Sequence, residues 1–126
     1  MNKDEILKMR EGRKMRELLA TLVMGWELYV PEAFDDRLRN YWRHPETKEA
    51  RSVESWHPDE NILDAFLVVD QVLHDNKDIA IRSSVRGWHV TIEAKYDDYV
   101  ANAETMPLAI CRAALLAIVP VTEGGV

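Results

Sequence analysis

The sequence predicts an α+β fold in which a small antiparallel three-stranded β-meander packs with three helices in an α-β-α sandwich-like arrangement. Three observations predict it: two amphipathic helical segments, a stretch of strict two-residue alternation, and a final apolar helix with a proline at its start. The 126 residues suit a single domain, 1–126, and 47% hydrophobic with 30% charged residues is a globular composition. With one cysteine, the chain has no internal disulfide.

The first helix is predicted over residues 3–24. Asn2 followed by Glu5 has the spacing of a capping box. Apolar side chains then recur at the helical period of 3.6 residues, and they are Met15, Leu18, Leu19, Leu22 and Trp26. Gly25 suits the cap after the last turn, because glycine readily adopts the left-handed conformation that ends many helices.

Residues 26–57 form an irregular aromatic and acidic segment in which neither the helical nor the strand period holds. Pro31 and Pro45 interrupt it, and aromatic residues such as Trp42 and Trp56 are scattered among charges. A bare loop of this length is unusual in a small domain, so we expect some short extended pieces pinned by the aromatic rings.

A second helix is predicted over 58–74, because Pro58 with Asp59 and Glu60 has the features of a first helical turn. Three strands are then predicted over residues 79–83, 88–95 and 99–103. The middle one alternates without a break, with Trp88 and Val90 on the apolar face and His89 on the other.

The last helix is predicted over 106–119, with Thr105 as its cap and Pro120 after its end, and 120–126 reads as a loose tail. It is apolar almost all round, apart from Arg112. Such a helix has to be covered on several sides. We therefore expect a homo-oligomer, because two helices and three strands offer limited cover.

The net charge of −6 disfavours duplex nucleic acid as a partner, because phosphate neutralisation dominates that binding. The first residues, Met1 to Glu5, lack the apolar run of a secretory signal. No apolar stretch reaches the length of about 18 residues that a membrane span needs. We expect a cytoplasmic protein without a membrane partner.

Several blocks of sequence resemble the phage ABA sandwich domain proteins of Gram-positive phages and prophages. In chain order these blocks are 23–26 (VMGW), 56–58 (WHP), 65–69 (AFLVV), 87–88 (GW) and 103–115 (AETMPLAICRAAL). The resemblance implies helices packed on a small sheet, a phage origin and thus the host cell cytoplasm, but no established activity. A full three-layer sandwich would require the aromatic segment or the first helix to cover the His89 face of the sheet.

Candidate ligand-binding residues are Trp42, Trp56, Arg82, Arg86 and Thr105. Two tryptophans in an irregular stretch are candidates for stacking on a base or another flat ligand, whereas Trp26 and Trp88 lie on apolar stripes and read as core. Arg82 and Arg86 flank the hairpin and are placed to hold a phosphate. Thr105 starts a helix whose free backbone N–H groups favour an anion, although the negative charge of Glu104 weakens the positive electrostatic field at this helix end.

No metal site or cofactor is expected. The four histidines, His44, His57, His74 and His89, do not fall at metal-ligand spacing, and Cys111 reads as a small core residue. The one candidate for acid–base chemistry is His89 with Glu93 on the same strand face. Cross-strand surface pairing is the commoner use of such residues.

These observations favour a non-catalytic phage accessory protein that binds a host component. The ligand would be a small nucleotide-like immune signal, sequestered as an anti-defence measure, or the partner would be a host protein. The first alternative is a structural or assembly component of the virion, which an apolar final helix would suit. The second is a small hydrolase that uses His89 and Glu93.

Overall fold

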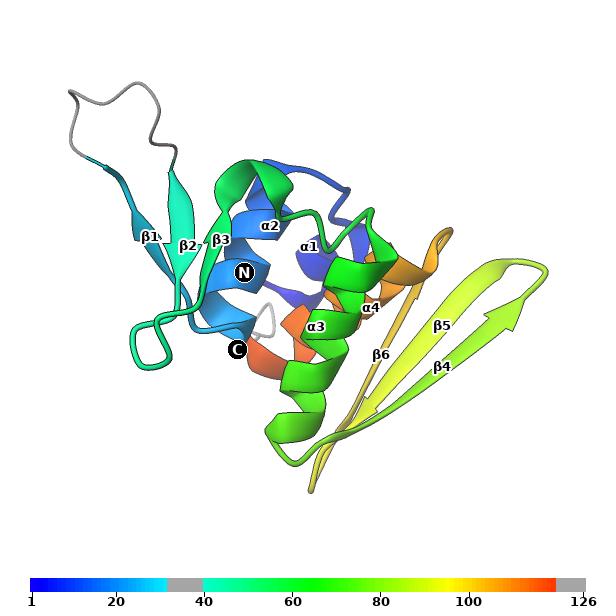
Figure 1. Cartoon of the computed structure of the whole chain (residues 1–126). Helices are drawn as coiled ribbons and strands as arrows, with labels where there is room; N and C mark the ends of the chain where they lie inside the picture. Colours follow the sequence, from blue (N-terminus) through cyan, green and yellow to red (C-terminus); the bar gives the residue numbers. More distant parts are fainter. Residues whose placement is uncertain (32–39, 120–126) are drawn as a thin grey trace.

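The computed structural model describes residues 1–31 and 40–119, and in it the helices lie between two three-stranded antiparallel sheets (Figure 1). The helical elements are α1 (Lys3–Lys8), α2 (Arg13–Leu18), the π-helical turn η1 (Leu19–Val23), the 3₁₀ turn η2 (Val53–Ser55), α3 (Ile62–His74) and α4 (Met106–Ile118). The strands are β1 (Glu27–Tyr29), β2 (Tyr41–Arg43), β3 (Ala50–Ser52), β4 (Asp78–Ser84), β5 (Gly87–Glu93) and β6 (Asp98–Ala103). The α+β class is confirmed, and the predicted tail lies outside the described residues.

Strands β4, β5 and β6 form the predicted meander. Val90 at its centre pairs with Ile81 on one side and Ala101 on the other, and all three point toward the helices. The strand ends differ slightly from the prediction, because Ala94 leaves the ladder and donates its N–H to the carbonyl of Asp97 in the next turn. The alternating pattern therefore located this sheet and its buried face.

The other face of this sheet carries His89, and none of the described helices covers it. Ala80 and Arg82 are exposed there, and Val100 is 48% exposed. Helix α1 packs against α4, on the inner side of the sheet, and the sheet of β1, β2 and β3 lies beyond the helices (Figure 1). In the described chain the layers therefore run sheet, helices, sheet, and the outer face of the β4–β6 sheet is open.

Helix α4 is the centre of the core. Thr105 caps it, with its hydroxyl accepting the N–H of Leu108. Every residue from 108 to 116 is buried, because β5, β6, α3, η1 and α1 surround the helix. The expectation that one chain would leave its apolar surface uncovered is wrong, so this helix gives no reason for an oligomer.

The predicted first helix, 3–24, is wrong as one continuous helix. The structure breaks it between Lys8 and Arg13. The carbonyl of Met9 accepts N–H groups from Arg112, and the N–H of Gly12 donates to Asp59 at 2.7 Å. Two contacts with distant side chains thus hold these backbone groups outside a helix.

The predicted start of the second helix at Pro58 is also wrong, because α3 begins at Ile62. Asn61 caps it, accepting the N–H groups of Leu63 and Asp64. Asp59 does not serve a first helical turn. Its buried carboxylate instead binds the guanidinium of Arg16, with Nε 2.9 Å from Oδ1.

The aromatic segment contains the short strands β1, β2 and β3 in that order, which form the second sheet. Short extended pieces were expected there. Each strand has three residues, which is too short for a two-residue period to be distinguished in the sequence.

Candidate functional site

Trp56 is a core residue, and its predicted role as an exposed stacking platform is wrong in this structure. Its side chain is 0% exposed, and its ring meets Trp26 edge-on, with centroids 4.6 Å apart. Its indole N–H donates to the carbonyl of Arg16 at 3.1 Å. A buried tryptophan with a satisfied N–H holds the structure together and offers no face to a ligand.

Trp42 is 4% exposed on β2 and lines a hollow of about 530 Å³ between α2, η1 and the small sheet. Leu18, Leu28 and Val53 give this hollow a mainly apolar lining. Almost none of Trp42 is open to solvent. The two predicted tryptophans therefore do not form a joint platform.

Arg82 and Arg86 are separated by the hairpin geometry. Arg82 lies on the open face of the sheet across from His89, whereas Arg86 lies in the turn. The hydroxyl of Ser84 fixes this turn by accepting the N–H of Arg86 at 3.2 Å. Only Arg86 reaches the pocket described next, so the predicted pair does not act as one clamp.

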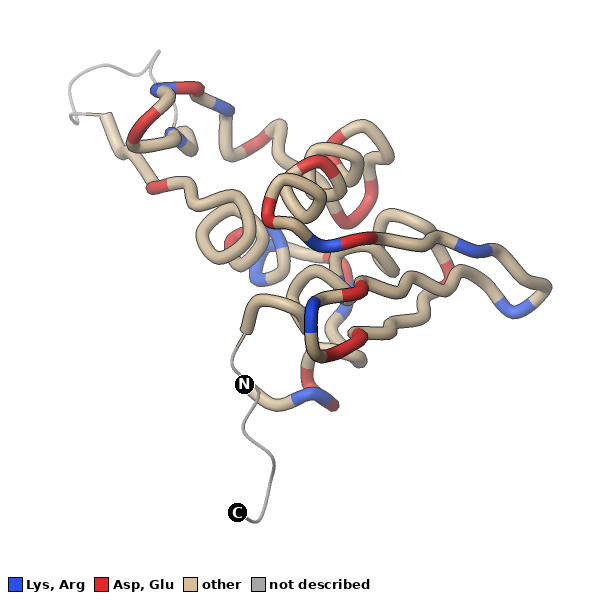
Figure 2. The backbone as a smooth tube through the Cα atoms, turned by 90° about the horizontal axis from the view of Figure 1, so that it is seen from below, with Lys and Arg blue, Asp and Glu red and all other residues tan. Residues whose placement is uncertain are grey.

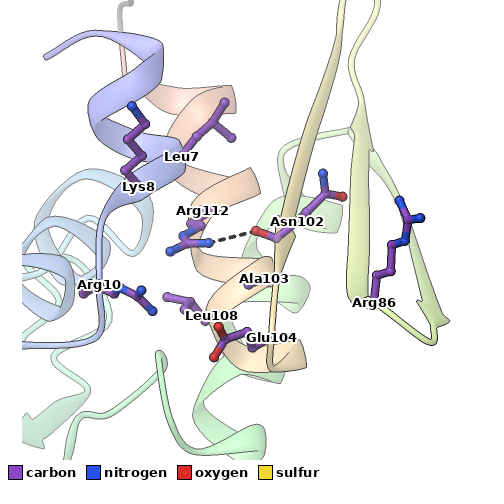
Figure 3. A pocket seen from close by; sticks show the side chains of 9 residues that line it. All are labelled: Leu7, Lys8, Arg10, Arg86, Asn102, Ala103, Glu104, Leu108 and Arg112. Atoms are coloured by element: carbon purple, nitrogen blue, oxygen red, sulfur yellow. Dashed lines mark hydrogen bonds between the residues drawn. The ribbon is translucent and has the colours of Figure 1, made fainter.

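A pocket of about 350 Å³ brings together positive side chains from four places in the chain (Figure 3). We call it the basic pocket. Its charged lining residues are Lys8, Arg10, Arg86, Glu104 and Arg112, and its uncharged ones are Leu7, Asn102, Ala103 and Leu108. Its lining has four positively charged residues and a single carboxylate, although the chain as a whole carries a net charge of −6.

The local structure explains how these side chains meet. The end of α1 and the break after it present Lys8 and Arg10, while β6 delivers Glu104 at the start of α4. In Figure 3, Arg10, Glu104 and Arg112 lie around a common space, whereas Lys8 and Arg86 stand at its periphery. The break in the predicted first helix is therefore part of the pocket wall.

Arg112 is the most constrained of these residues, at 9% exposed. Its Nε and one terminal nitrogen donate to the carbonyl of Met9, at 3.0 and 2.9 Å, and the other donates to the carbonyl of Asn102 at 2.9 Å. Among the described residues no carboxylate forms an ion pair with it. Its positive charge is thus held by neutral oxygens.

Burial lowers the pKa of Arg112, and the neighbouring charge of Arg10 lowers this pKa further. Glu11 and Glu104 act in the opposite direction. An arginine stays protonated even so. Buried charges in proteins are normally paired, so this guanidinium favours a negative group placed beside it.

Thr105 does not line the basic pocket. Its hydroxyl is used for the cap on Leu108, its carbonyl accepts the N–H of Ala109, and Pro107 has no N–H to offer. The first turn of α4 therefore has few free amides, and the predicted anion site at this helix end is not formed.

Sequence reasoning missed Lys8, Arg10 and Arg112 as candidate site residues. Arg112 carried a visible signal, since it is a single charge within an apolar helix. Lys8 and Arg10 carried none, because their approach to Arg112 depends on the helix break.

The predicted acid–base pair of His89 and Glu93 is not formed. They lie four positions apart on β5, about 13 Å along an extended chain. His89 instead contacts Asn102 through Nδ1 and the hydroxyl of Ser84 through Nε2, the latter at 3.2 Å. The hydroxyl of Ser84 already serves the turn. This arrangement is that of a hydrogen-bonded hairpin, not of the proposed hydrolase site.

The described part of the chain offers neither a metal site nor a membrane-spanning helix. It contains no group of three histidine, cysteine or acidic side chains able to hold a metal ion. None of its helices is long and apolar enough to cross a membrane. Cys111 is fully buried on α4, and burial raises the pKa of its thiol, with the carboxylate of Asp59 acting in the same direction.

Comparison with known proteins agrees with this fold. A crystal structure at 2.0 Å of a phage protein from Bacillus cereus ATCC 14579 is similar, with a TM-score of 0.63 and 20% sequence identity over 88% of this chain and 95% of that one. Among curated proteins none matches the sequence. Residues 17–115 match the family described as the phage ABA sandwich domain. The chain therefore belongs to the phage ABA sandwich domain family.

Proposed function

We propose that this phage protein is a non-catalytic accessory protein that binds a small anionic host ligand, nucleotide-like in its phosphate groups, in the basic pocket. The observation that carries the proposal is the buried guanidinium of Arg112, which has no ion pair in the described structure and shares the pocket with Arg10, while Lys8 and Arg86 stand at its periphery (Figure 3). Sequestration of a phosphate-bearing signal from the host would be the consequence of such binding.

The electrostatics favour a ligand with more than one negative charge. Arg112 uses three of its five N–H groups on carbonyl oxygens, which leaves two for a phosphate oxygen. Arg10 forms no ion pair with any described residue, so its guanidinium can bind a phosphate without first breaking another ion pair. Arginine is suited to this contact because its planar N–H groups match phosphate oxygens.

The size of the pocket limits the ligand. A volume of about 350 Å³ lies near the lower end of small-molecule sites, which begin at about 300 Å³. It suits a phosphate group with part of a sugar, held against Leu7 and Leu108. The lining contains no aromatic ring for stacking, so we expect the affinity to come from phosphates and to vary little with the base.

Isothermal titration calorimetry with ATP and inorganic pyrophosphate tests this function. We expect binding that weakens as the salt concentration rises, and an affinity about tenfold lower for Arg10→Ala, because one charge-assisted contact is worth about 1.5–3 kcal/mol before solvent screening. Arg13→Ala is the matched control, because Arg13 is an exposed arginine on α2 that does not line the basic pocket. Equal losses in the two variants, or no binding of either probe, would refute the proposal.

A second measurement separates binding from turnover. The ligand should be recovered chemically intact by chromatography after the complex is heat-denatured. Accumulation of hydrolysis products that depends on His89 would instead support the hydrolase alternative.

A further inference from the structure

The open face of the β4–β6 sheet carries an ordered pattern of side chains. Because residues directly opposite each other on neighbouring strands point to the same side, the register defines three rows across this face. From one end of the sheet to the other, the rows are Asp78, Glu93 and Asp98; then Ala80, Thr91 and Val100; then Arg82, His89 and Asn102.

The first row is an unbalanced set of like charges. Asp78 and Asp98 flank Glu93 directly, an arrangement that destabilises a sheet, and none of the three forms an ion pair with a described residue. Lys77 precedes Asp78 by one residue, so strand alternation directs it to the opposite face. Lys95 lies in the following turn, with its ammonium 5.3 Å from the ring centroid of Tyr96.

The opposite end of the same face is basic. Arg82 lies in the third row and Arg86 in the adjoining turn, and neither forms an ion pair with a described residue. In Figure 2 the hairpin carries Lys or Arg positions toward its tip, and Asp or Glu positions beside Lys or Arg positions at its base. One face thus carries an acidic end and a basic end with a small uncharged row between them.

We propose that this face binds a second copy of the chain, related by a two-fold axis through the row of Ala80, Thr91 and Val100. With the strands of the two copies running in opposite directions, the acidic row of each copy lies over the row of Arg82, His89 and Asn102 of the other, and Asp78 lies opposite Arg82. The acidic end of each copy meets the basic end of the other, so the surface is complementary to itself, as a two-fold interface requires. The arrangement relieves the repulsion within both acidic rows at once.

The exposed apolar side chains fit the same arrangement. Val100 is 48% exposed in the central row, where the two copies would meet. Val85 is 104% exposed at the hairpin tip, and Tyr96 is 84% exposed at the other end of the sheet. An antiparallel pair of copies brings Val85 of one toward Tyr96 of the other, twice per dimer.

The size of the face sets the strength of the dimer. Three strands of about seven residues cover roughly 23 by 14 Å, or about 300 Å² in projection. A standard stable interface buries about 800 Å² per partner. We therefore expect a weak, reversible dimer that forms at micromolar to millimolar concentration and weakens with salt.

Charge reversal provides the test, with sedimentation equilibrium between about 10 µM and 1 mM as the measurement. Arg82→Glu and Asp78→Arg should each weaken self-association about tenfold or more, since each reversal turns the two attractive contacts between positions 78 and 82 into repulsive ones. Combining both reversals in one chain should restore the dimer. An equimolar mixture of the two single variants should form heterodimers, because both contacts between positions 78 and 82 then join opposite charges.

Arg13→Glu on α2 is the control for charge alone and should leave self-association unchanged. Arg82 and Asp78 are exposed, so we expect both variants to keep the wild-type melting temperature, which circular dichroism checks. A wild-type chain that is monomeric up to 1 mM would overturn the proposal. So would a dimer that is indifferent to the reversals, or single variants that fail to complement each other.

Discussion

Asp59 shows at the scale of one residue how a distant contact determines local structure. Its carboxylate is 1% exposed and accepts N–H groups from Gly12 and Arg16, which lie more than 40 positions earlier in the chain. Local rules place an acid after a proline in the first turn of a helix. That prediction failed because the guanidinium and the free amide bind this carboxylate more strongly than a helix end would. By contrast, the role of Thr105 as a helix cap was predicted correctly, because the N–H that it accepts belongs to Leu108, only three residues away.

Replacement of this carboxylate should therefore be costly. We expect Asp59→Ala to lower the free energy of unfolding by about 2–4 kcal/mol, because it leaves the amide of Gly12 without an acceptor and Arg16 without its buried partner. Glu60→Ala is the control. Glu60 also contacts Arg16, but its side chain is 57% exposed, so its loss should cost less than about 1 kcal/mol. Urea denaturation measures both, and equal effects would contradict the role given to Asp59.

At the scale of elements, the number of residues in a helix or strand determined whether the sequence predicted it. The seven-residue strands and the thirteen-residue helix α4 are long enough to display their periods, and each was predicted. Strands β1, β2 and β3 have three residues each, so their pairing depends on contacts that no local pattern encodes. The turn between β4 and β5 is an intermediate case. Its glycine, Gly87, is visible in the sequence, but the close approach of another strand that requires a glycine there is visible only in the structure.

This close approach gives a prediction for Gly87. Its φ is +122°, and a Cβ there would lie 2.5 Å from the carbonyl oxygen of Ala103. Gly87→Ala should therefore destabilise the protein by about 2–4 kcal/mol, from backbone strain and steric overlap together. Gly25→Ala is the matched control, because Gly25 has a φ of +71° but no atom within 4 Å of that position, and it should cost only about 1 kcal/mol. Similar melting temperatures for the two variants would contradict the overlap.

At the scale of the whole molecule, the basic pocket could not have been predicted from local patterns. It combines α1, the break after it, the hairpin turn and the junction of β6 with α4. Arg86 was predicted as a ligand contact from its place beside the turn, but its neighbours come from positions up to 79 residues away in sequence, such as Leu7. The virion-component alternative stays a prediction, which detection of the protein in purified particles would test.

Global stability should also depend on pH through Cys111. Burial raises the pKa of this thiol in the folded chain, while an unfolded chain has a cysteine pKa of about 8.5. Above that value the unfolded state loses the proton and the folded state keeps it, so the unfolded state binds fewer protons. Stability from this group must then fall as pH rises, by up to about 1.4 kcal/mol per pH unit. Urea denaturation between pH 8 and 10 measures the slope. The slope should be smaller in Cys111→Ala, whatever that substitution costs at pH 7, and an unchanged slope would show that the thiol ionises without unfolding.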